Sequence, residues 1–95
     1  MHQNNKVLHR FRKLFDLSAQ QISGTPLVEI AGNRRVLIEN HKGVAEYEKE
    51  RIVVLSKNGR IIISGCSLEI QQMSRHQLVV FGNIDGVFVE GGSNK

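Results

Sequence analysis

The residues with the chemistry of an acid and a base stand together in one short stretch, Glu39-Asn40-His41. A carboxylate beside an imidazole is a common pair for general acid and base catalysis, which makes this stretch the first place to look for an enzyme. If the stretch belongs to a strand, adjacent side chains point to opposite faces, and no nucleophile stands in a recognisable motif nearby. Asn40 and Gly43 also suit the first and fourth positions of a type I turn. The turn explains more of the pattern, so no catalytic residue and no enzymatic activity are predicted.

The remaining reactive side chains form no recognisable site. The four histidines are scattered, and the second cysteine that a zinc site of the usual spacing would use is absent. Cys66 beside a strand is more often a small buried hydrophobe than a nucleophile, and catalysis by it needs His41 or His76 close in space. The nine glycines fall mostly at turn positions and form no phosphate cradle. We predict no metal and no cofactor, and the lone cysteine indicates a reducing compartment.

The strongest charged feature is a basic segment near the start of the chain. Its apolar residues recur at i, i+1, i+4, i+7 and i+8 from Val7 to Phe15, which predicts an amphipathic helix of about 12 residues. Residues 1–16 carry a net charge of +3 out of the chain's +4, so the basicity is local. A helix this short must dock on something, either the sheet, a protein partner or an anionic membrane surface. Its candidate contact residues are Lys6, Arg10, Phe11, Arg12, Lys13 and Phe15.

From Leu27 onward the sequence changes to short runs rich in Val and Ile, separated by Gly and Asn at hairpin spacing. Asn58-Gly59 is predicted as the central pair of a two-residue type I′ hairpin. Runs at 61–64, 68–73, 77–81 and 87–90 predict separate short strands. The connections are too short for helical crossovers, so the pairing should be antiparallel. The expected fold is mainly β: a single antiparallel domain of about seven short strands, arranged as a barrel, a sandwich or a stacked sheet, preceded by one N-terminal amphipathic helix.

Three runs, Ile52–Leu55, Ile61–Ile63 and Leu78–Phe81, are apolar without alternation, which indicates strands covered on both faces. The second face must meet the helix, another wall of the domain or another subunit. With no Trp, four Phe and one Tyr, few aromatic side chains are present to fill a large interior. Self-association into a homo-oligomer therefore remains one of the ways in which the second face could be covered. The predicted organisation is a basic helix and linker over 1–26, a β domain over 27–90 and a polar tail over 91–95.

The length and composition fit one small globular domain. The chain has 95 residues, which are too few for two domains with separate cores. Its 40% apolar and 23% charged residues are close to the balance of an ordinary globular protein. Charges interrupt the first segment, so it lacks the apolar stretch of a secretory signal. No run approaches the roughly 20 apolar residues that span a bilayer. We expect a cytoplasmic protein.

Several motifs together resemble the YabP/YqfC family of sporulation proteins, in particular its YqfC branch. The resemblance covers residues 6 to 90, and the stretch Ile-Glu-Asn-His-x-Gly-Val over 38–44 is its most specific part. The other matching segments are Gly32-Asn33, Lys57-Asn58-Gly59, Ile63-Ser64-Gly65, Leu68-Glu69-Ile70, Phe81-Gly82-Asn83-Ile84 and Val87-Phe88-Val89-Glu90.

The resemblance implies a protein of endospore-forming bacteria, produced in the mother cell during sporulation, with no known enzymatic activity. Members are typically encoded beside a membrane protein, of the YqfD type in this branch, which implies a membrane protein as partner. The family supplies no catalytic residues, so Glu39, Asn40, His41 and Gly43 are a signature whose role is either turn architecture or partner contact. The expected function is a non-enzymatic assembly or adaptor module in the mother-cell cytoplasm, peripheral to the forespore-enclosing membrane.

The alternative function is a small β-domain RNA-binding protein that uses the basic N-terminal helix. Sheet platforms for nucleic acid carry exposed aromatic residues interleaved with basic ones. Here Phe81 and Phe88 stand in apolar runs, and the charges of the remaining 79 residues sum to +1. Nucleic acid is therefore not the expected partner.

Overall fold

The computed structural model describes residues 24–91, and these form one six-stranded sheet in which every neighbouring pair is antiparallel. The order across the sheet is β1-β2-β6-β5-β4-β3. The predicted mainly β, antiparallel fold class is confirmed, whereas the predicted N-terminal helix lies outside the described residues. The strands are β1 (Leu27–Ala31), β2 (Arg35–Glu39), β3 (Val44–Tyr47), β4 (Arg51–Ser56), β5 (Gly59–Met73) and β6 (Gln77–Gly91).

Two of the strands are much longer than predicted. β5 joins the runs 61–64 and 68–73, and β6 joins the runs 77–81 and 87–90, so the prediction of four short strands here was wrong. Pairing continues between β5 and β6 across three register shifts, the first two at Ser64/Gly65 and Cys66/Glu69. Such bulges insert unpaired residues and bend a strand without ending it. The glycines that suggested strand ends therefore mark bends inside continuous strands.

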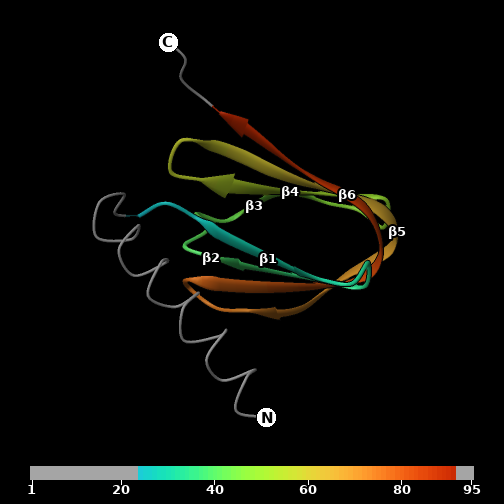
Figure 1. Cartoon of the computed structure of the whole chain (residues 1–95). Helices are drawn as coiled ribbons and strands as arrows, with labels where there is room; N and C mark the ends of the chain where they lie inside the picture. The colour runs from blue at the N-terminus through green and yellow to red at the C-terminus, as the bar shows by residue number, and fades with distance from the viewer. Residues whose placement is uncertain (1–23, 92–95) are drawn as a thin grey trace, which may run out of the picture.

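The bends fold the sheet over so that its two halves face each other (Figure 1). Layer 1, the upper half in Figure 1, contains β3, β4, the first half of β5 and the second half of β6. Layer 2 contains β1, β2, the first half of β6 and the second half of β5. The core between the layers consists of Val36, Ile38, Ile52, Val54, Ile61, Ile63, Leu68, Leu78, Val80 and Ile84.

Glycine is required where β5 and β6 cross from one layer to the other. A Cβ on Gly65 would overlap the backbone carbonyl of Asn83, and one on Gly82 would lie 2.8 Å from the carbonyl oxygen of Ser67. Gly82 also has a φ of 150°, a backbone conformation that other residues rarely adopt. The close approach of the two backbones at the bend thus depends on residues without side chains.

The hairpin between β4 and β5 differs from the predicted one. Ser56 is paired with Gly59, so the turn consists of Lys57 and Asn58, and none of residues 57–59 has a positive φ. The predicted type I′ turn centred on Asn58-Gly59 was therefore wrong. Gly59 instead begins β5, where it pairs with Gly91 of β6 on its other side.

Candidate interaction surface

Residues 40–43 carry the chain from β2 in layer 2 to β3 in layer 1, and most of the signature lies in this crossover. Asn40 has a φ of 66°, and its backbone N–H donates to the carbonyl of His76 at 2.6 Å. Gly43 has a φ of 120°. In a type I turn starting at Asn40, the Gly43 N–H would donate to the Asn40 carbonyl, but here it donates to Nδ1 of His41 at 3.0 Å. The crossover is thus organised around the imidazole ring.

His41 is the one buried polar or charged residue among residues 24–91, with 5% of its surface exposed. Because Nδ1 accepts the Gly43 N–H, the ring proton belongs on Nε2, which donates to the carbonyl of Ser74 at 2.8 Å. Both ring nitrogens are therefore bonded to the backbone. The ring joins the crossover to the turn between β5 and β6, two segments that lie 33 residues apart in the sequence.

The other two signature contacts also stay within the chain. Glu39 Oε2 accepts a hydrogen bond from Nε2 of Gln77 at 3.2 Å, across the β2–β6 pair. Asn40 Nδ2 donates to the carbonyl of Thr25 at 3.1 Å, which fixes the segment that leads into β1. These contacts give the signature stretch an architectural part in the fold. The candidate helix residues Lys6, Arg10, Phe11, Arg12, Lys13 and Phe15 lie outside the described residues.

Cys66 does not form a site with His41. It lies at the bend of β5, whereas His41 contacts Ser74 beyond the far end of the same strand. Cys66 is exposed rather than buried, contrary to the sequence expectation, and its Sγ accepts a long contact of 3.5 Å from Nδ2 of Asn83. Over residues 24–91, no three His, Cys, Asp or Glu side chains gather in a way that could hold a metal ion.

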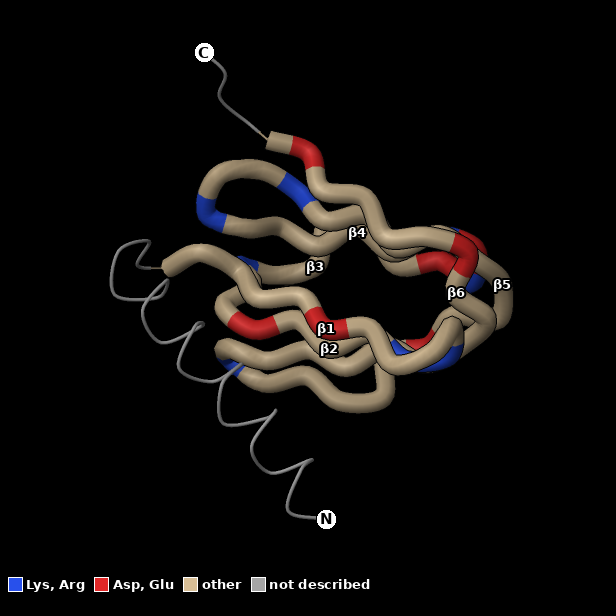
Figure 2. Tube along the Cα trace, viewed as in Figure 1, with Lys and Arg blue, Asp and Glu red and all other residues tan. Residues whose placement is uncertain are grey.

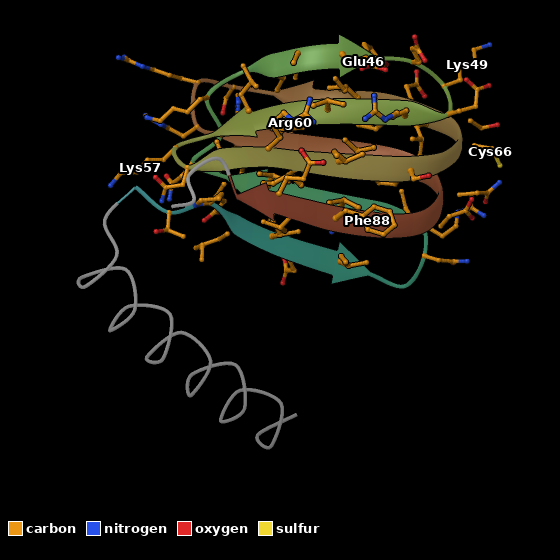
Figure 3. The ribbon with its side chains drawn as sticks, turned by 90° about the horizontal axis from the view of Figure 1, so that it is seen from above. Glu46, Lys49, Lys57, Arg60, Cys66 and Phe88 are labelled. Atoms are coloured by element: carbon orange, nitrogen blue, oxygen red, sulfur yellow. The ribbon has the colours of Figure 1, made fainter. Side chains whose placement is uncertain are left out.

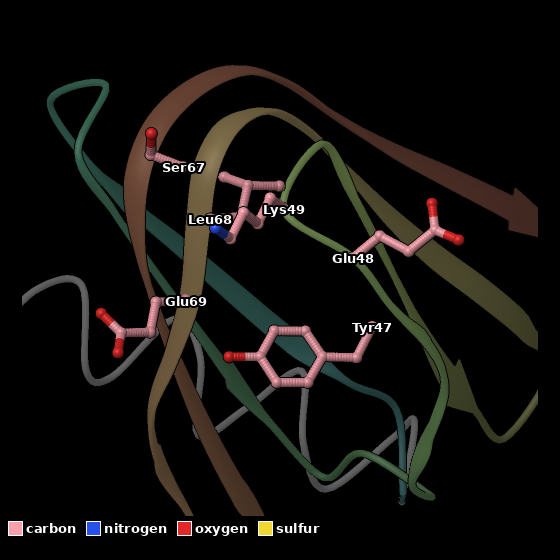
Figure 4. Close-up of a pocket in the computed structure, with 6 residues that line it drawn as sticks. All are labelled: Tyr47, Glu48, Lys49, Ser67, Leu68 and Glu69. Carbon is pink, nitrogen blue, oxygen red and sulfur yellow. The ribbon is translucent and has the colours of Figure 1, made fainter.

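A shallow hollow lies between the β3–β4 turn and the bend of β5 (Figure 4). The hydroxyl of Tyr47 accepts the backbone N–H of Ile70 at 2.9 Å, and the Leu68 N–H donates to the carbonyl of Lys49 at 2.9 Å. In Figure 4 the carboxylates of Glu48 and Glu69 point in opposite directions. The polar groups of the hollow therefore serve mainly to attach β5 to layer 1, and they do not converge on a ligand.

The outer face of layer 1 carries a continuous row of apolar side chains across three strands. Val53 of β4 is paired with Ile62 of β5, and Ile62 is paired with Phe88 of β6. Val53 is buried, Ile62 is half-buried and Phe88 is 57% exposed, so exposure rises toward β6. We call these three residues the Phe88 row. Leu55, 37% exposed, flanks the row on β4, and Figure 3 shows Phe88 on this outer face.

Charged side chains beside the Phe88 row are paired with each other. Arg51 Nη1 lies 2.8 Å from Glu46 Oε1, and Arg60 contacts Glu90 Oε1 through Nη2 at 2.6 Å and Nε at 3.0 Å. Both pairs are partly exposed, so each contributes little to folding. The two ion pairs flank the Phe88 row, and in each pair the opposite charges balance. An apolar centre with a polar rim is typical of a protein contact surface.

The Phe88 row continues into an open sheet edge. β2 pairs with β6 only over residues 77–81, so within residues 24–91 the second half of β6 has a strand on one side alone. Val89 in this half is 70% exposed. The sequence had indicated surplus apolar surface on the runs that contain Val53 and Ile62, but it missed Phe88 and Val89. Val87, Phe88 and Val89 form an uninterrupted apolar run of the same kind as Ile61–Ile63, and this run could have indicated the surface.

The comparisons with known proteins agree with the signature. A family model described as the YabP family matches residues 24–95, a range that includes all of the described structure. The protein named "Uncharacterized protein YqfC" of Bacillus subtilis (strain 168) is 23% identical over 83 residues, which cover 87% of this chain and 89% of that protein. The described chain is a small antiparallel β protein built on one folded sheet. It belongs to the YabP/YqfC family.

Proposed function

We propose that this protein is a non-enzymatic assembly or adaptor module that works through protein contacts on the outer face of layer 1. In this proposal it acts in the mother cell during sporulation, beside the forespore-enclosing membrane. The observation that carries the proposal is the Phe88 row, an apolar strip that runs from buried Val53 to a phenyl ring 57% exposed. An exposed aromatic on an apolar strip with charged borders is typical of a binding hot spot.

The polar groups of the signature support a contact module rather than an enzyme. Catalysis needs an acid or base with a free position toward a substrate. Both nitrogens of His41 are bonded to backbone groups, and the Glu39 carboxylate is bonded to Gln77. These side chains hold the crossover, and their bonds to the chain leave the Phe88 row as the feature on which we base the proposal.

The partner in this proposal is a membrane protein of the YqfD type. The resemblance to the YqfC branch supports this choice because it implies a membrane protein as partner, and the chain belongs to the YabP/YqfC family. Among residues 24–91 no helix has the length and apolar character to cross a bilayer. A place at the membrane would then come from the partner, from the basic N-terminal segment, or from both.

Charge gives the nucleic-acid alternative no support in the described part of the chain. Residues 24–91 contain eight Lys and Arg against eight Asp and Glu, and Figure 2 shows both signs spread over the fold. Binding to phosphates requires a basic patch or stripe. An RNA-binding function would therefore rest on the basic segment 1–16.

The test is co-purification of the tagged full chain with a co-expressed membrane protein of the YqfD type. Leu55→Glu places a charge on the outer face of layer 1, opposite Arg60 in the β4–β5 pair. Phe81→Glu is the matched control, since Phe81 is 41% exposed on the outer face of layer 2 and lies opposite Arg35. We expect Leu55→Glu to reduce recovery of the membrane protein at least tenfold and Phe81→Glu to leave it unchanged. No co-purification with the unaltered chain, or equal losses in both variants, would overturn the proposal.

A further inference from the structure

The free edge of β6 presents hydrogen-bonding groups as well as apolar side chains. In β4, Leu55 turns its backbone toward the crossover, where its N–H donates to Gly43 and its carbonyl accepts from Lys42. In an antiparallel ladder these directions alternate from residue to residue and from strand to strand. Leu55 is opposite Arg60, and Arg60 is opposite Glu90, with no register shift between these pairs and Val87. The N–H and C=O groups of Glu90 therefore point toward β5, and those of Val87 and Val89 point away from β5. They face the side on which no described strand is paired.

Among the described residues, this edge lacks several of the devices that usually prevent strands from pairing between molecules. Exposed edges are commonly interrupted by Pro, Lys or an inward-pointing charge. Residues 84–91 contain no Pro and no Lys, and the Glu90 carboxylate is held by Arg60 on the outer face. No Cα atom of β1 lies within 8 Å of one in β6, so β1 leaves room beside the edge.

The sequence of the edge is symmetric about Phe88 over the three residues Val87 to Val89, and one acidic residue and one glycine flank these on each side. Residues 85–91 read Asp-Gly-Val-Phe-Val-Glu-Gly, with Val87 and Val89 on either side of the phenylalanine. If a second copy pairs antiparallel with Phe88 opposite Phe88, Val87 faces Val89, Glu90 faces Gly86, and Asp85 faces Gly91. Each acidic residue then lies opposite a glycine, and each valine opposite a valine.

We propose that two copies of this chain pair through the second half of β6, with the two-fold axis at Phe88. Val87 and Val89 exchange backbone hydrogen bonds with Val89 and Val87 of the second copy, and the two phenyl rings meet on the outer face. Cross-strand aromatic and β-branched pairs of this kind stabilise a sheet. Layer 1 becomes continuous through both copies, and the two Phe88 rows join into one apolar strip.

Neighbouring registers are less favourable. An axis at Val87 places Asp85 opposite Val89, and an axis at Val89 places Phe88 opposite Glu90. Either arrangement sets a carboxylate against an apolar side chain, whereas the axis at Phe88 does so nowhere between residues 85 and 91. The inference rests on this edge alone, and the proposed membrane partner is not needed for it.

The register is tested by cross-linking in a Cys66→Ser background of the full chain. Phe88→Cys brings two thiols directly opposite each other, where Cβ atoms of an antiparallel pair lie about 4.5 to 5.5 Å apart and a disulfide needs little movement. Val87→Cys is the matched control, because its counterpart is displaced along the strand by two residues. We expect mild oxidation to give a covalent dimer for Phe88→Cys at least tenfold faster than for Val87→Cys. Faster cross-linking of Val87→Cys would overturn the register.

Pairing itself is tested on the unaltered chain by light scattering after size exclusion. We expect twice the mass of one chain, falling to one chain for Val89→Lys. Met73→Lys is the control, since Met73 is 53% exposed at the end of β5 in layer 2, and it should keep the double mass. A single-chain mass at every concentration, or an assembly that Val89→Lys leaves intact, would overturn the pairing. A single chain that still co-purifies with the membrane protein would remove this inference and leave the proposed function standing.

Discussion

The two halves of β6 have similar composition and opposite surroundings. Residues 77–81 lie between β2 and β5, where Leu78 and Val80 are completely buried. Among the described residues, 86–91 pair with β5 alone, and here Phe88 and Val89 are 57% and 70% exposed. Both halves are rich in Val and Phe, so apolar character does not distinguish them. The two halves differ in the number of sides on which a strand is paired. The first half, paired on both sides, stabilises the fold, and the second half, paired on one side, is available to a partner.

The largest expected effect on the free energy of unfolding comes from shortening an aliphatic side chain in each half of β6. Leu78→Ala removes a fully buried side chain from the core and should lower the free energy of unfolding by about 2 to 5 kcal/mol. Val89→Ala should lower it by less than about 0.5 kcal/mol in the single-chain form. Urea unfolding of dilute samples measures both. Similar losses for the two variants would contradict the division of β6 into a core half and a contact half.

An intermediate effect is expected at the turn that leads into the first half of β6. His41→Ala leaves the Gly43 N–H and the Ser74 carbonyl without their partner and should lower the free energy of unfolding by about 2 kcal/mol. His41→Asn offers an amide oxygen close to the position of Nδ1, so it should recover part of the loss. Thermal unfolding of the three proteins gives the comparison. If His41→Ala is as stable as the unaltered chain, the ring does not hold the crossover.

The smallest effect concerns the charged border of the second half. Arg60→Gln breaks the contact with Glu90, a pair with side chains 46% and 52% exposed. An exposed pair of this kind contributes less than about 1 kcal/mol, and added salt should reduce the difference between the two proteins. Thermal unfolding at low and high salt measures it. A larger loss that salt does not change would mean that Arg60 acts through packing rather than charge.

The sequence predicted the kind of sheet well because strand patterns are local. The alternation in β1 and β2 and the short loops gave antiparallel pairing and nearly correct bounds for the first strands. It failed at Gly65 and Gly82, since a glycine at a strand end and a glycine in a bulge look alike in one sequence. Which of the two occurs depends on whether pairing resumes beyond the glycine, as it does between Glu69 and Phe81.

The surface was harder to predict than the fold because burial is a property of the assembled layers. In the sequence, the signature around His41 suits either a turn or a contact with a partner. The hydrogen bond from His41 to the carbonyl of Ser74, 33 residues away, gives it an architectural part in the fold. The apolar runs did indicate that some strands need cover on a second face. Only the folding of the sheet into two layers shows that Leu78 is covered by the opposite layer, whereas Phe88 lies on an outer face and stays exposed.

Hydrogen exchange of the β6 amides, followed as a function of protein concentration, tests the central claim most directly. Amides at Leu78 and Val80 lie between two paired strands and should exchange slowly at every concentration. Those at Val87 and Val89 should exchange rapidly in dilute solution and become protected as the chains pair, because their N–H groups face the open edge. Exchange at Val87 and Val89 that does not change with concentration, whether fast or slow, would contradict the account.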